Sequence, residues 1–133
     1  MARRLILDTG VLIGIERTGT PVTFADDDDV AIAAVSAAEL LLGVELADEV
    51  RRQPREDFVT AVLAVVPVEE YGLDVARVHA RLLAHVRRAG KPRGAHDLII
   101  AATAAATARA VVTRDRKAAF AELPGVRIAD LAS

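Results

Sequence analysis

Four acidic residues have the type and position to carry chemistry in this sequence, namely Asp8, Glu39, Asp97 and Asp115. Each follows a predicted strand or opens the helix after it, and in a parallel α/β sheet such positions meet at one edge. Carboxylates crowded at that edge repel one another and raise one another's pKa values. Oxygen ligands without Cys or His suit Mg²⁺ or Mn²⁺, whose charge offsets the repulsion. The arrangement predicts metal-assisted phosphodiester hydrolysis, in which the metal activates water.

Each acid, considered alone, also has a structural interpretation as a helix-start residue. Asp8 and Asp115 could cap helices that begin just after them. Glu39 could complete a capping box by reaching back to the backbone amide of Ser36. Asp97 opens a helix, where the dipole favours a carboxylate. Helix-start acids are common, so the joint occurrence of four acids at strand ends favours a site more than any one of them does.

The elements that must position these acids alternate between short apolar runs and helical patterns. Strands are predicted at 5–7, 30–35, 65–68, 110–113 and 126–128. Helices are predicted at 11–17, 36–50, 56–66, 71–89, 97–108 and 117–123, with Pro54 interrupting between the second and third. Alternating strands and helices imply a mostly parallel sheet. We therefore expect one α/β domain over 1–133, with a mostly parallel sheet of about five strands covered by helices on both faces.

Composition limits the partners that this domain could bind. With 17 basic and 19 acidic residues the formal net charge is -2, so any contact with nucleic acid must be local. The sequence has no cysteine, which excludes disulfides and thiolate zinc sites and fits a reducing cytoplasm. The first residues do not resemble a signal peptide, and the apolar stretch 98–108 is too short to span a bilayer. We expect a cytoplasmic protein with no membrane association.

Rival motifs do not account for the acids. The sequence contains no G-x-G-x-x-G, and Pro92 after Gly90-Lys91 excludes a phosphate-binding Walker loop. The triplet Asp8-Thr9-Gly10 looks like that of retroviral-type aspartic proteases, which are all-β, whereas this sequence is rich in helical patterns.

Four segments, in order, resemble PIN-domain ribonucleases, and most closely the VapC toxins of VapBC toxin–antitoxin modules. They are LILDTGVLI (5–13), VSAAELLLGV (35–44), HDLIIAATAAA (96–106) and VVTRDRKAAFAELPGVRI (111–128). Gly90-Lys91-Pro92 falls where that family has a loop containing Gly and Pro before the third acid. Any one segment would be a weak signal, but the ordered set of four is specific.

The resemblance implies a site. Asp8, Glu39, Asp97 and Asp115 would form its acidic cluster, with Asp8 and Asp97 as direct Mg²⁺ ligands, Asp115 next, and Glu39 acting through water. Thr9 and Thr113 match hydroxyl positions that would orient the carboxylates or the substrate. The family cuts RNA with water activated at the metal and leaves a 5′ phosphate and a 3′ hydroxyl.

The resemblance also implies partners: an RNA substrate, a second copy of the chain in a homodimer, and a cognate VapB-type antitoxin. Arg114 and Arg116 flank Asp115 and would contact RNA, although exposed arginines are also common at helix ends. The antitoxin would cover the acidic site and follow an apolar surface to which Leu40, Leu41 and Leu42 contribute. The acidic run at 26–29 is expected to be a solvated loop, with no assigned role.

Two other functions stay open at this point. One is a PIN-like nuclease that acts in RNA maturation or on structured DNA. The other is an inactive PIN-like module that binds a partner protein. The presence of all four acids argues against the inactive module, because a degenerate member would lose at least one of them.

Overall fold

Five strands form one parallel sheet in the order β3-β2-β1-β4-β5, within the residues that the computed structural model describes, 2–20, 22–114, 120 and 122–129. The strands are β1 (Arg4–Leu7), β2 (Asp29–Ala33), β3 (Val68–Glu69), β4 (Ala110–Val112) and β5 (Ile128–Ala129). The helices are α1 (Thr9–Thr18), α2 (Ala34–Leu46), α3 (Glu49–Val65), α4 (Leu73–Ala89) and α5 (Ala95–Ala106).

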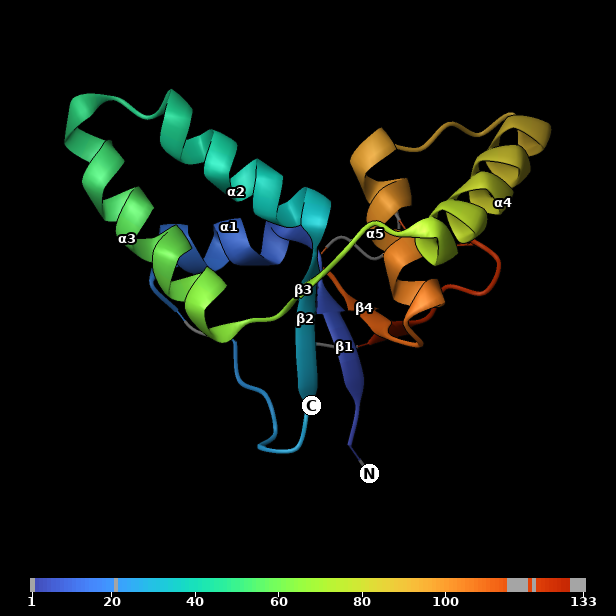
Figure 1. The fold of residues 1–133 in the computed structure, drawn as a ribbon, viewed down its shortest axis with the longest axis horizontal. Coiled ribbons are helices and arrows are strands. Elements are labelled where there is room, and N and C mark those ends of the chain that lie inside the picture. The colour runs from blue at the N-terminus through green and yellow to red at the C-terminus, as the bar shows by residue number, and fades with distance from the viewer. Residues whose placement is uncertain (1, 21, 115–119, 121, 130–133) are drawn as a thin grey trace.

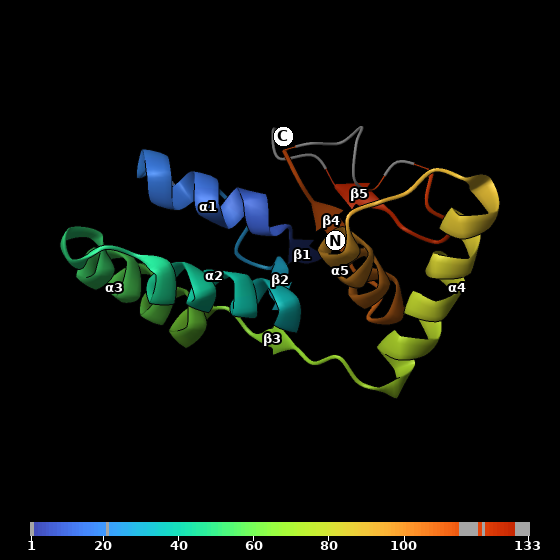
Figure 2. The ribbon, with the colours of Figure 1, turned by 90° about the horizontal axis from the view of Figure 1, so that it is seen from above.

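The sheet separates two apolar cores, with helices on each side (Figures 1 and 2). Strand side chains point alternately to the two faces, so Leu5 and Leu7 join α1, α2 and α3 on one side. Ile6, between them, joins α4 and α5 on the other side. The predicted α/β class, parallel sheet and two-sided helical cover are confirmed.

Helix α5 approaches the sheet closely because its inner face is made of small residues. Ala101, Ala102 and Ala104 are completely buried between the sheet and α4. Small side chains let the backbone of a helix come close to a sheet. Alanine therefore allows the space between α5 and the strands to be filled at the density typical of protein interiors. Among the described helices, none is both long and apolar enough to cross a membrane.

Several predicted boundaries were wrong. The apolar run 30–35 does not stay extended: β2 ends at Ala33 and α2 begins at Ala34, because a continuously apolar run fits a buried strand and a buried helix equally well. Pro54 lies inside α3 instead of interrupting it. A proline there lacks an N–H to donate and crowds the carbonyl four residues earlier, yet the helix continues and buries Val59. The third strand, at Val68–Glu69, begins later than expected. The predicted helix 117–123 falls largely outside the described residues.

The acidic run at 26–29 is only in part the solvated loop that the sequence suggested. Asp26 and Asp27 are exposed, but the Asp28 side chain is 1% exposed and accepts two bonds from the Arg3 guanidinium, at 3.1 and 2.7 Å. The Arg3 hydrogen bond, helped by the backbone N–H of Ala25, lowers the pKa of Asp28 to about 2. This carboxylate therefore fixes the entry to β2.

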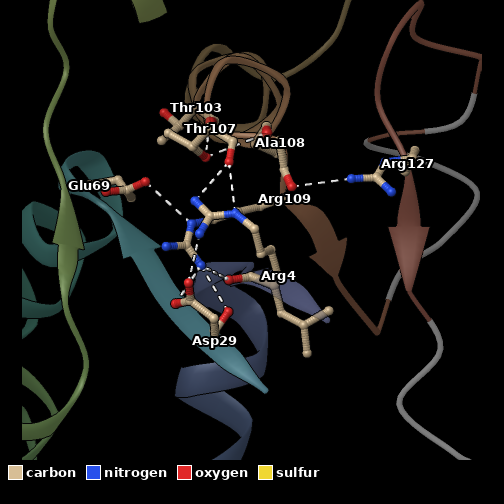
Figure 3. A network of polar contacts seen from close by, with 10 residues as sticks. Arg4, Asp29, Glu69, Thr103, Thr107, Ala108, Arg109 and Arg127 are labelled. Atoms are coloured by element: carbon tan, nitrogen blue, oxygen red, sulfur yellow. Dashed lines mark hydrogen bonds and ion pairs between the residues drawn. The ribbon is translucent and has the colours of Figure 1, made fainter. Parts of the chain in front are cut away.

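A buried arginine that the sequence analysis missed ties four strands together (Figure 3). Arg109 directly precedes β4 and is 6% exposed. Its Nη1 donates to the carbonyl of Leu5 at 3.1 Å and to the carbonyl and Oδ1 of Asp29 at 2.8 and 3.0 Å. Its Nε donates to Glu69 Oε2 at 3.3 Å. Arg4 contributes a second guanidinium to Asp29, at 2.7 Å.

Replacing Arg109 with Met should destabilise the fold. The change leaves the Leu5 carbonyl and the inner side of Asp29 without their donor, and we expect a loss of about 2–4 kcal/mol in the free energy of unfolding. The value lies below that of a fully buried pair because the Asp29 side chain is 44% exposed. Urea unfolding would measure it, with the exposed Arg77→Met as matched control. Equal stability of the two variants would contradict a structural role for Arg109.

Candidate active site

The predicted acids that the structure describes lie at the carboxyl edge of the sheet. Asp8 follows β1 directly, Glu39 lies on α2 after β2, and Asp97 lies in the first turn of α5. Thr113 follows β4 and is 3% exposed. The fourth predicted acid, Asp115, and the predicted RNA contact Arg116 lie outside the described residues, so their placement stays a prediction.

Asp8 occupies the N-cap position of α1 but does not cap it. Its backbone is extended, with φ −64° and ψ 145°, and its side chain accepts no capping bond from the helix. Instead, Thr113 Oγ1 donates to Asp8 Oδ2 at 3.0 Å. The backbone N–H of Asp8 donates to the carbonyl of Val112 at 2.9 Å and fixes the junction to β4. Asp8 therefore begins the helix, as the structural interpretation expected, but its side chain does not cap it and is held toward the neighbouring strand end.

Glu39 is held by a chain of hydroxyls from two elements. Thr9 Oγ1 lies 2.8 Å from both Ser36 Oγ and Glu39 Oε1. A hydroxyl carries one proton and a carboxylate only accepts, so Thr9 donates to Glu39 and Ser36 donates to Thr9. The capping-box interpretation was wrong, because α2 begins at Ala34 and Ser36 is completely buried inside its first turn.

Asp97 lies close to the residue that begins α5. Gly94 is the N-cap, and a Cβ built on it would lie 2.8 Å from Asp97 Oδ2. Any side chain at position 94 would displace this carboxylate. Asp97 also lies in the first turn of α5, so the dipole interpretation and a role in a site are compatible. Next to it, His96 Nδ1 lies 3.5 Å from Glu39 Oε2 and brings α5 and α2 together at the same edge.

The three described acids share one electrostatic environment. Burial raises the pKa of the Asp8 carboxyl, and the charges of Asp97 and Glu39 raise it further, while the Thr113 hydrogen bond acts in the opposite direction. Among the described residues, no three acids or histidines converge closely enough to form a finished metal site. Mutual repulsion keeps carboxylates apart, and a divalent cation would offset it. The oxygen-only donor set fits Mg²⁺ or Mn²⁺.

Comparison with known proteins decides the family. The PIN-domain family model matches residues 5–126. The chain belongs to the PIN-domain family. Ribonuclease VapC5 of Mycobacterium tuberculosis is 36% identical to this PIN domain over 123 residues, which are 90% of this chain and 87% of that protein. The sequence resemblance to VapC-type PIN domains is confirmed.

Solved structures give the same fold. The VapBC-5 toxin–antitoxin structure from M. tuberculosis matches this PIN domain with a TM-score of 0.75 at 32% identity, covering 96% of each chain. VapBC2 from Rickettsia felis, solved with a DNA fragment from its promoter, matches with a TM-score of 0.87 over 96% of this chain and 98% of that chain. At 19% identity the second likeness concerns the fold alone.

Sequence reasoning missed three residues that shape the site of this PIN domain. Ser36 was interpreted as part of a capping box, His96 was not connected with Glu39, and Gly94 was assigned no role. A glycine three residues before a helix-opening aspartate is a weak signal that the carboxylate needs room. For Ser36 and His96 the partners are distant in sequence, so no local pattern could reveal them.

Proposed function

We propose that this PIN domain is a Mg²⁺-dependent endoribonuclease that hydrolyses RNA phosphodiester bonds and acts as the toxin of a toxin–antitoxin pair. The observation that carries the proposal is the Asp8 carboxylate, which lies partly buried at the end of β1, caps no helix and is repelled by two further acids. Burying mutually repelling charges costs stability, and a cation-dependent function explains why the chain retains them.

The described residues supply positions for the metal and for the reacting groups. Asp8 and Asp97 are the proposed direct ligands, and Glu39 would act through water. Asp115, which lies outside the described residues, is the next proposed ligand. The bound ion would act as a Lewis acid that activates water and neutralises charge on the phosphate. Thr113 and Thr9 orient Asp8 and Glu39 through their hydroxyls. Cleavage would leave a 5′ phosphate and a 3′ hydroxyl.

The proposed antitoxin surface lies on α2 and the start of α3. Leu41, Leu42, Leu46 and Val50 are exposed there, at 48, 54, 76 and 85%. Leu40, which the sequence analysis included, is 6% exposed and packs in the core, so it was wrongly assigned to this surface. Curated and solved relatives carry the VapC and VapBC names, which supports a VapB-type antitoxin as partner. We also propose a homodimer that acts in the cytoplasm, where RNA is available.

Magnesium binding tests the proposed site without relying on cleavage. Asp97→Asn keeps the shape of the side chain but removes a ligand charge, so calorimetric titration with MgCl₂ should show affinity reduced by about 10- to 100-fold or lost. Asp26→Asn, at an exposed turn, is the matched control and should bind like the parent. Equal Mg²⁺ binding by Asp97→Asn and the parent would remove Asp97 from the ligand set.

Cleavage tests the function itself. The purified chain should cut single-stranded RNA in Mg²⁺ and not in EDTA. Structured DNA assayed in parallel separates a ribonuclease from a nuclease of broader substrate range. A chain that binds Mg²⁺ but cuts neither substrate would be an inactive partner-binding module.

A further inference from the structure

Arg114 lies across the backbone of α1 at Gly14. A Cβ built on Gly14 would collide with the Arg114 guanidinium, at 2.6 Å from Cζ and 3.0 Å from Nη2, and closer still to Nη1. Gly14 is a helical residue without a positive φ, so backbone conformation does not require glycine there. A Cβ at position 14 would displace the guanidinium from this position, because the far end of an arginine side chain can move.

Both residues of this contact are connected along the chain to the active site: Arg114 through Thr113, and Gly14 through the start of α1. Arg114 follows Thr113, whose hydroxyl donates to Asp8. Helix α1 begins next to Asp8, and Gly14 lies six residues further along, roughly 9 Å at 1.5 Å per residue. The guanidinium therefore lies against α1 at Gly14, six residues beyond Asp8 along the chain.

The charge of Arg114 is available to a ligand. Arg114 is exposed, and within the described part of the chain it forms no ion pair with a carboxylate. Glu16, the acid on α1, pairs with Arg55 at 3.5 Å. A planar guanidinium matches the oxygens of a phosphate, and Gly14 leaves room for the Arg114 guanidinium against the helix.

We propose that Arg114, seated on Gly14, binds the RNA phosphate that flanks the scissile one, and that Gly14 is the positioning residue for this contact. The inference rests on the ribonuclease function proposed above. In this proposal the RNA backbone leaves the acidic site along α1. The contact with Arg114 also gives a physical reason for glycine at position 14.

Gly14→Ala and Arg114→Ala, alone and combined, test the proposal. Each single variant should raise KM for a short single-stranded RNA by about tenfold with little change in kcat, because a flanking contact contributes uniform binding. Each should also reduce the slope of log affinity against log salt by about 0.7, the value for one phosphate contact on a single strand. The double variant should be no worse than either single variant.

Two controls separate a role in RNA binding from a structural role: the thermal midpoint of Gly14→Ala, and the replacement of another exposed arginine. Gly14→Ala should raise the thermal midpoint, since alanine favours the helix, so its loss of RNA affinity would not reflect unfolding. Arg77→Ala, exposed on α4, should leave KM and the salt slope unchanged. Additive effects of the two substitutions on KM in the double variant would contradict the proposal that Gly14 positions Arg114. An unchanged KM in Gly14→Ala would contradict it as well. A parent chain that fails to cut RNA would instead overturn the proposed function.

Discussion

Replacing Asp8 with Asn is expected to abolish RNA cleavage while making the metal-free protein more stable. A metal ion supplies several kcal/mol of transition-state stabilisation, so losing about 4 kcal/mol of it lowers kcat/KM by about a thousandfold. Asn keeps an acceptor for the Thr113 hydroxyl, and the local structure should persist. Single-turnover cleavage of a labelled RNA in Mg²⁺ would measure the loss.

The gain in stability follows from the raised pKa of Asp8. A carboxyl whose pKa is higher in the folded than in the unfolded chain favours folding below its unfolded pKa, and this contribution is lost as pH rises through the folded pKa. At neutral pH the ionised Asp8 therefore opposes folding, through burial and through repulsion from Asp97 and Glu39. Asn removes that cost, so in EDTA at pH 7 the variant should unfold at a higher temperature than the parent.

Two controls make this prediction specific. Mg²⁺ should raise the midpoint of the parent but not that of Asp8→Asn, because only the parent retains the ligand. Asp26→Asn, which removes an exposed charge, should leave both cleavage and midpoint near those of the parent. Cleavage by Asp8→Asn at the parental rate would remove Asp8 from the site. A lowered midpoint in EDTA would show that its charge is structurally required.

The positions of Asp8 and Thr113 could be predicted from the sequence because strand ends fix them. β1 and β4 are short apolar runs, their carboxyl ends meet at one edge of a parallel sheet, and the residues after them must face each other. The region after β2 was harder. Its apolar run passes from strand to helix without a change of composition, so Ser36 was assigned to the wrong helical position.

Other features depend on partners far away in the sequence, and no local pattern could reveal them. Arg109 is buried because its acids come from β2 and β3, 80 and 40 residues earlier. Gly14 lies against the side chain of Arg114, which is 100 residues further along the chain. Propensity and periodicity describe neighbours along the chain, whereas these contacts are set by tertiary packing.

Leu42→Glu is expected to separate neutralisation by the antitoxin from ribonuclease activity. Leu42 is 54% exposed on α2, in the layer of α1, α2 and α3 on the face of the sheet to which Leu5 and Leu7 point. Covering a leucine contributes about 1.5–3 kcal/mol, and an unpaired charge in its place adds a desolvation cost. We expect antitoxin affinity to fall by about a thousandfold, or about 4 kcal/mol, while cleavage by the isolated chain is unchanged.

Leu73→Glu is the matched control, since Leu73 is 68% exposed on α4, in the helical layer on the other face of the sheet. Both substitutions exchange leucine for a good helix former, so neither should unfold its helix. Calorimetry with a VapB-type antitoxin would measure affinity, and growth on co-expression would measure neutralisation. If the apolar surface of α2 holds the antitoxin, cells expressing Leu42→Glu stop growing although antitoxin is present, whereas Leu73→Glu stays neutralised. Equal affinities of the two variants would place the antitoxin elsewhere.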